Sequence, residues 1–317
     1  MADEQPSAAS ASQIVRDVFG EEIASIARFP TGRCHYVFDV VAGSGRKIVV
    51  RIAEPQNRAY IEGGVYWSKL LRPMGVPLPR LLAADTEPRF PYMILERLEG
   101  TDLGSIYSQL SSGQKQSIAS RVNEIQQIVS VLPSGNGFGY ATSREQVLYR
   151  TWWDAIEELL VRSEKWIKGA GVVDPAIIGR LRGSADGLQD YFAQMRPTPF
   201  LDDLTTRNVI VADGELTGVV DIDEVCFGDP LFTPSLVRMS LLSSDFDTQY
   251  VEFLCPMDRL SLTQRCAFTF YTAHACVVFL SELGQQFNCD QTPEVTEAQI
   301  KKLRCILDAL FDELRHS

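Results

Sequence analysis

Residues 199–230 read PFLDDLTTRNVIVADGELTGVVDIDEVCFGDP. Two short apolar runs in this segment, 209–211 and 216–220, have the composition of strands, and the Asp213-Gly214 pair between them is a strong hairpin signal. Aspartates surround both runs, at positions 202, 203, 221, 223 and 229. This concentration of negative charge beside strand-forming sequence indicates a site where carboxylates bind a cation or accept a proton.

The hairpin predicts how the polar side chains are arranged. Pairing across a two-residue turn at 213–214 sets Asn208 opposite Val219. Asp221 then points to the same face as Asn208, roughly 7–8 Å away between Cβ atoms. An amide oxygen and a carboxylate at that spacing can share Mg²⁺ with a phosphate. Asp203 lies in the loop before the first strand, where it can accept the proton of an attacking hydroxyl, so the arrangement is typical of phosphoryl transfer.

The same residues resemble the motifs of the aminoglycoside phosphotransferase-like family, which has the protein-kinase-like fold. Segment 201–208 is similar to the family's His-Gly-Asp-Leu-x-x-x-Asn loop, 220–223 to its Ile-Asp-(aromatic)-acid motif, and 228–230 to its Gly-Asp-Pro. The resemblance covers nearly the whole chain. It implies ATP as the phosphoryl donor, with GTP remaining open, and Mg²⁺ as cofactor. The implied roles are catalytic base for Asp203 and magnesium ligand for Asn208 and Asp221.

The resemblance also assigns nucleotide-binding residues in the first hundred positions. Arg51, in the strand-like VVRIA, stands where the family has a basic residue that contacts the phosphates, and Glu62 is the best candidate for its partner on the next helix. The segment PTGRCH (30–35) precedes a strand where the family's phosphate-covering loop lies, and MILERLEG (93–100) is similar to its hinge. The residues implied at the nucleotide are therefore Thr31, Gly32, Arg33 and the backbone groups of Glu96 and Leu98.

Two positions depart from the family pattern. Leu201-Asp202 replaces His-Gly and removes a histidine that usually braces the catalytic loop, and arginine replaces the more usual lysine at position 51. An arginine fork contacts phosphate in a bidentate and less mobile way than lysine. Both changes bear on the rate more than on the type of reaction. For Asp202 and Asp223 a loop-bracing role and a functional role stay open, whereas Asp229 is expected to cap a helix or brace its loop.

The apolar periodicity predicts an α+β, two-lobed, protein-kinase-like fold. We expect a disordered tail at 1–10, a small β-rich N-lobe at 11–98 and a larger, mainly helical C-lobe at 99–317, with a hinge near 95–101. Strands are expected at 35–42 and 47–53, joined by a glycine turn. Helices are expected near 60–75, 114–132, 151–167 and 263–287, and after Thr296, which begins a capping-box pattern.

Composition excludes several classes of protein. A net charge of −11 over 317 residues argues against a nucleic-acid partner. No apolar run approaches the roughly 18 residues of a membrane span. Seven scattered cysteines without a Cys-x-x-Cys pair fit a cytoplasmic location, and three dispersed histidines are too few for a histidine-based metal site. We expect His35 to be an exposed loop residue, His274 a buried residue with its hydrogen bonds satisfied, and the Trp152-Trp153 pair core packing.

The sequence thus predicts an ATP-dependent phosphotransferase that acts on a hydroxyl of a small molecule. The acidic balance and the resemblance favour an aminoglycoside or another amino-bearing acceptor, while macrolide, choline-like, sugar and amino-acid acceptors remain open. The acidic residues at 154–158 can form the solvated face of their helix, or they can help to bind a cationic acceptor. The alternatives are a nucleotide-binding pseudokinase that serves as a regulatory or scaffold module and, with less support, a metal-dependent α/β hydrolase. The oligomeric state is not predicted.

Overall fold

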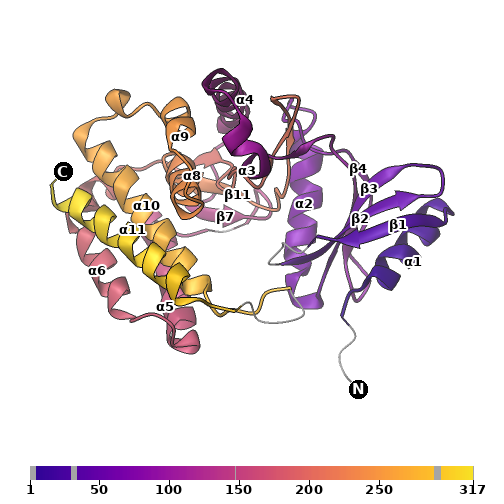
Figure 1. The fold of residues 1–317 in the computed structure, drawn as a ribbon, viewed down its shortest axis with the longest axis horizontal. Helices are drawn as coiled ribbons and strands as arrows, with labels where there is room; N and C mark the ends of the chain where they lie inside the picture. Colours follow the sequence, from indigo (N-terminus) through magenta and orange to yellow (C-terminus); the bar gives the residue numbers. More distant parts are fainter. Residues whose placement is uncertain (1–4, 30–33, 147, 289–293, 317) are drawn as a thin grey trace.

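The computed structural model describes residues 5–29, 34–146, 148–288 and 294–316. An antiparallel five-stranded sheet forms the N-terminal part, and most of the remaining chain is helical (Figure 1). This is the α+β class that the sequence predicts. The strand order is β1-β2-β3-β5-β4, with bounds β1 (Ile23–Arg28), β2 (His35–Ala42), β3 (Lys47–Ala53), β5 (Tyr92–Glu96) and β4 (Leu81–Asp85).

Helix α1 (Ala8–Phe19) begins within the predicted tail. Ser7 and Ser10 form a capping box, in which each hydroxyl accepts the backbone N–H of the other residue at 3.2–3.3 Å. The buried Ala11 packs on the apolar residues of β2 and β3. The predicted disordered tail is therefore wrong for residues 8–10, which are helical.

Helix α2 (Arg58–Leu71) lies between the sheet and the helical part of the chain (Figure 1). Its Trp67 is fully buried, and the indole N–H donates to the carbonyl of Ala141 at 2.8 Å. Ala141 ends β7 (Gly139–Ala141), a strand of the helical part. The helix therefore connects the two parts of the molecule directly, beside the chain connection at 97–100.

The hairpin at the centre of the predicted site is present, but its register changes along its length. Asp213 and Gly214 have φ of 52° and 81°, as a two-residue type I′ turn requires. They join β9 (Val209–Ala212) to β10 (Glu215–Val219). A bulge at Thr217 shifts the pairing, so Val219 faces Val209, and the prediction that it faces Asn208 is wrong.

A three-stranded sheet positions the two loops that carry the carboxylates of the candidate site. Its order is β7-β11-β8, with β11 (Val225–Gly228) in the centre and β8 (Thr198–Phe200) at one edge. Strand β8 leads directly into Asp202 and Asp203, and β11 follows directly on Asp223 and Glu224. Because β8 and β11 pair side by side, these carboxylates come from adjacent strand ends.

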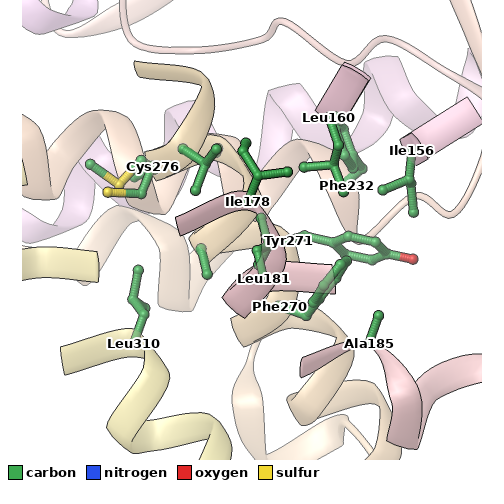
Figure 2. Packing of buried hydrophobic residues seen from close by; sticks show 14 of the residues in the cluster. Ile156, Leu160, Ile178, Leu181, Ala185, Phe232, Phe270, Tyr271, Cys276 and Leu310 are labelled. Atoms are coloured by element: carbon green, nitrogen blue, oxygen red, sulfur yellow. The ribbon is translucent and has the colours of Figure 1, made fainter. Parts of the chain in front are cut away.

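The helical part packs around one large apolar core. Side chains from α5 (Trp152–Ala170), α6 (Ala176–Ser184), α8 (Phe232–Ser243), α10 (Leu262–Glu282) and α11 (Glu297–Arg315) meet there (Figure 2). Trp152 is 1% exposed and donates from its indole to the Tyr271 hydroxyl at 2.8 Å, whereas Trp153 stacks on Phe192. The prediction of core packing for this pair is confirmed. Within the described ranges, no helix has the length and apolar composition needed to cross a membrane.

His274, in α10, is buried without the satisfied hydrogen bonds that the sequence led us to expect. It is 1% exposed, and neither ring nitrogen has a hydrogen-bond partner among the residues that the structure describes. Its ring packs against that of Phe232 at a tilt of 55°, with centroids 5.6 Å apart. Burial, followed by the charge of Arg162, lowers the pKa of His274 to about 3. The side chain is therefore neutral in the folded protein over most of the pH range.

We expect His274→Phe to reduce the acid sensitivity of the fold. The unfolded histidine binds a proton near pH 6.5, whereas the folded one does so only near pH 3, so stability is lost as pH falls between these values. Between pH 8 and pH 5 this single group costs the wild type about 2 kcal/mol of unfolding free energy. Urea unfolding at both pH values measures the difference between the two proteins, in which other titrating groups cancel. If the unfolding free energies of the two proteins changed equally with pH, His274 would not be the source of the acid sensitivity.

Candidate active site

The loop that carries Asp203 is braced by side chains that the sequence analysis did not identify. Gln126, in α4 (Ser112–Ser130), donates its amide to the carbonyl of Leu201 at 2.7 Å and accepts the Leu201 N–H at 3.0 Å. The hydroxyl of Thr233 donates to the same carbonyl at 2.8 Å. Leu201 itself is 1% exposed. The chain thus replaces the absent loop-bracing histidine with a buried leucine and a backbone clamp.

Asp203 and Asn208 are connected within this loop. Asp203 is exposed, and Asn208 is half-buried and donates its amide N–H to the carbonyl of Asp203 at 2.9 Å. This hydrogen bond uses the nitrogen side of the amide and leaves Oδ1 of Asn208 to act as an oxygen ligand. The oxygen matches the hard donors that Mg²⁺ prefers.

Asp221 lies next to Asn208 across the hairpin, although the strand register that predicted this is not the one observed. The N–H of Val220 donates to the carbonyl of Asn208 at 2.9 Å, so the strand pairing continues to the residue before Asp221. Asp221 then takes a left-handed conformation with φ of 65°, which is uncommon outside glycine, and aspartate tolerates it better than most residues. Its side chain is half-exposed. Loop geometry, and not strand alternation, orients this carboxylate.

Arg51 reaches both acids of the 221–223 segment from β3. Its guanidinium donates to Asp223 through Nη1 at 2.8 Å and Nη2 at 2.7 Å, and to Asp221 through Nη2 at 2.5 Å. Burial lowers the pKa of Arg51, but the two carboxylates raise it above its ordinary value, so the side chain stays charged. The predicted pairing with Glu62 is wrong: Glu62 is exposed and makes no hydrogen bond or ion pair with Arg51.

His35 completes the cluster around Arg51, and the expectation that it is an exposed loop residue is wrong. It begins β2, is 5% exposed, and its Nδ1 lies 2.8 Å from Nη2 of Arg51. Because arginine can only donate, Nδ1 accepts and the proton of the neutral ring is on Nε2. Burial, followed by the charge of Arg51, lowers the pKa of His35 to about 3. The ligand atoms of His35, Asp221 and Asp223 lie within 4.8 Å of one another, and the guanidinium is the cation among them.

Asp202 and Glu224 form a second, partly buried acidic group beside the catalytic loop. Burial raises the pKa of Asp202 to about 7, with the charge of Glu224 adding to it and a hydrogen bond from Tyr140 opposing it. Burial also raises the pKa of Glu224 to about 7, with the charge of Asp223 adding. A cation bound near these two carboxyl groups would favour their charged forms.

Asp229 has a structural role, and two of the three acids of the helix at 154–158 have partners within the fold. Asp229 is 3% exposed, accepts the Leu231 N–H at 3.0 Å, and accepts the hydroxyls of Tyr191 and Tyr271 at 2.7 and 2.9 Å. This confirms the predicted bracing role. On α5, Asp154 forms the capping box with Thr151, Glu157 pairs with Arg182 at 2.6 Å, and Glu158 is exposed.

The predicted nucleotide-binding segments are described only in part. Thr31, Gly32 and Arg33 lie outside the described residues. Glu96 ends β5, and its N–H donates to the carbonyl of Arg80 at 2.9 Å, so this group is not available to adenine. Leu98 follows β5 and makes no backbone hydrogen bond to any residue that the structure describes, which leaves its backbone groups available to a ligand.

Comparison with known proteins agrees with this geometry. The model of the phosphotransferase enzyme family matches residues 25–252. None of the curated protein sequences is significantly similar to the chain. Many solved structures share the fold, and at 13–17% identity the likeness shows the fold alone.

Three of these structures illustrate the extent of the match. Aminoglycoside phosphotransferase APH(4)-Ia is 16% identical, covers 97% of this chain and 98% of its own, and has a TM-score of 0.67. A thermostable mutant of that protein, in a ternary complex with AMP-PNP and hygromycin B, is 17% identical with 97% and 98% coverage and a TM-score of 0.66. The GDP complex of aminoglycoside 2'-phosphotransferase-IIIa is 13% identical with 97% and 99% coverage and a TM-score of 0.67. The resemblance and fold class predicted from the motifs are confirmed.

Proposed function

The chain belongs to the phosphotransferase enzyme family, and on that premise we propose that it transfers the γ-phosphoryl group of ATP to a hydroxyl of a small molecule. The observation that carries the proposal is the hydrogen-bonded unit of Asp203, Asn208 and the hairpin. The Asn208 amide donates to the Asp203 carbonyl, and the Asn208 carbonyl accepts from Val220, directly before Asp221. One unit therefore supplies a proton acceptor and two oxygen ligands.

Each residue of the unit has a separate role in the proposal. Asp203 orients the acceptor hydroxyl and takes its proton as the phosphoryl group transfers. Asn208 Oδ1 and the Asp221 carboxylate would hold Mg²⁺, which neutralises charge on the transferring group when bound. Leu98 offers backbone groups to the base of the nucleotide, and Arg51 offers N–H donors to its phosphates. ATP is the favoured donor, and GTP remains open.

The acceptor is proposed to carry an amino group close to the hydroxyl that reacts. The support is the pair of acids Asp202 and Glu224 at the catalytic loop, whose pKa values are raised by burial and by neighbouring carboxylates, while the charge of Arg162 only partly opposes the rise at Glu224. An ammonium group would supply a compensating positive charge. The hygromycin B complex of the similar structure concerns that protein and raises aminoglycosides as one candidate class.

A nucleotide-binding pseudokinase is the second candidate. The observation in its favour is the contact between Arg51 and Oδ1 of Asp221, because this oxygen must give up the arginine to become a metal ligand. A regulatory or scaffold module would need nucleotide binding but no base at Asp203.

ADP release separates the two candidates. The protein is incubated with MgATP and a panel of aminoglycosides, choline-like alcohols, sugars, macrolides and amino acids, and nucleotide binding is measured in parallel. We expect ADP formation that depends on one amino-bearing class of acceptor. Binding of MgATP without acceptor-dependent ADP across the panel would favour the pseudokinase, and failure to bind any nucleotide would contradict both.

A further inference from the structure

A bidentate ionic contact across the candidate site joins Arg51 of the sheet to Asp223 of the 221–224 loop. Two nitrogens of the guanidinium face two oxygens of the carboxylate, at 2.8 and 2.7 Å. The arginine side chain is 6% exposed and that of Asp223 13% exposed. A bidentate pair of this kind fixes the plane of the guanidinium as well as its position.

Two glycines of helix α2, Gly63 and Gly64, leave space for Asp223 beside Arg51. A Cβ on Gly63 would lie 2.1 Å from the backbone oxygen of Asp223, and a Cβ on Gly64 would lie 2.8 Å from its Oδ1. Glycine inside a helix costs about 1 kcal/mol relative to alanine, so two in succession require a compensating contact. Here the compensation is the close approach of the 221–224 loop, which the absence of both side chains permits.

Nη2 of Arg51 has more acceptors nearby than it has hydrogens, and these acceptors differ in how exposed their side chains are. Nη2 carries two hydrogens but has three acceptors within 2.8 Å, namely His35, Asp221 and Asp223. The side chain of Asp221 is 50% exposed, against 13% for Asp223 and 4% for His35. Asp221 is therefore the partner that can leave most readily, and its departure leaves the two Nη2 hydrogens to His35 and Asp223. A phosphate can then accept the second Nη1 hydrogen, which in this structure faces only the weakly accepting sulfur of Met93, at 3.8 Å.

We propose that Asp223 is the residue that positions Arg51 for the nucleotide phosphates, in the role that the sequence assigned to Glu62. Asp223 and His35 hold the guanidinium in place whether or not nucleotide is bound, and Asp221 exchanges its contact with Arg51 for the metal ion. The inference rests on the proposed function, since it requires a phosphate-bearing ligand in this site. The orienting acid thus comes from the loop after the hairpin and not from the helix.

The test compares binding of MgATP with binding of adenosine by calorimetry. Adenosine has the same base and ribose but no phosphate, so it does not depend on Arg51. In Asp223→Asn we expect about 10-fold or greater loss of MgATP affinity, as for a hydrogen bond to a charged group, with adenosine affinity unchanged within about twofold. Glu62→Gln is the matched control, and both affinities should stay at the wild-type value.

Gly64→Ala tests the same pair without removing a charge. The new methyl group displaces the Asp223 carboxylate, so MgATP affinity should fall selectively, as in Asp223→Asn. Gly179→Ala, at an exposed helical glycine with no atom within 4 Å of its added Cβ, should bind both ligands as the wild type does. Equal losses for MgATP and adenosine, or wild-type MgATP binding in both variants, would overturn the assignment. Wild-type protein that binds adenosine but not MgATP would instead contradict the proposed function.

Discussion

Asp203→Ala is expected to lower kcat for phosphorylation of the acceptor by about 10²–10⁴-fold, the range that a positioned general base contributes. Nucleotide affinity should change by less than about twofold, because the Asp203 side chain is not among the groups that would hold the phosphates or the metal ion. The Asn208 amide bonds to the backbone carbonyl of Asp203, and alanine keeps that carbonyl. The loop should therefore keep its conformation in the variant.

Steady-state ADP release with saturating acceptor, together with calorimetric titration of MgATP, measures both quantities. Asp258→Ala removes another exposed aspartate, in the short helical turn at Met257–Arg259, and should have wild-type activity. If Asp203→Ala released acceptor-dependent ADP at the wild-type rate, Asp203 would not be the base. A large loss of MgATP affinity in this variant would place it among the ligand-binding residues.

Local patterns predicted several secondary-structure elements correctly. The Asp213-Gly214 turn, the strand pair 35–42 and 47–53, and the capping box at Thr296 are each specified within a few residues of chain. For the same reason, the motif spacing identified the family. The bulge at Thr217 could not be predicted, because the Thr217 hydroxyl donates to the carbonyl of Glu99, more than a hundred residues earlier.

The wrong partner for Arg51 has a similar cause. The helical position of Glu62 matched the family pattern, but which acid reaches Arg51 depends on a loop that contacts it from 172 residues away. One signal was present in the sequence, because two adjacent glycines in a helix indicate that another backbone approaches closely. The prediction that His35 is exposed failed for the same reason, because its contacts are with Arg51 and with Asp223 of the same distant loop.

Gln126 shows which part of the site a motif cannot reveal. The motif marks the departure at Leu201 but not its replacement, since Gln126 lies 75 residues away in α4. An isolated glutamine in an amphipathic helix has no feature that distinguishes it from a solvated one. The clamp became visible only when the packing of α4 against β8 was known.

Removal of Asp221 is expected to have the second large effect, on the response to magnesium. A metal ion at phosphoryl transfer is worth several kcal/mol of transition-state stabilisation, so turnover in Asp221→Ala should fall by about 10³-fold or more. Asn208 alone would remain as a protein ligand for the ion. Arg51 would keep Asp223 and His35 as partners, so the fold without ligands should survive the substitution.

Thermal unfolding with ATP alone and with ATP plus Mg²⁺ measures this response without an acceptor. A ligand at 100 times its Kd stabilises the folded state by about 2.7 kcal/mol, and the part that Mg²⁺ adds should disappear in Asp221→Ala. Asp245→Ala is the matched control, because Asp245 also has a positive φ, 57°, and alanine there imposes a comparable backbone strain. Asp245 pairs with Lys302 on the surface, and its variant should keep the full magnesium response. A magnesium response that persists in Asp221→Ala would remove this carboxylate from the metal site, and with it the reason for Asp221 to leave Arg51.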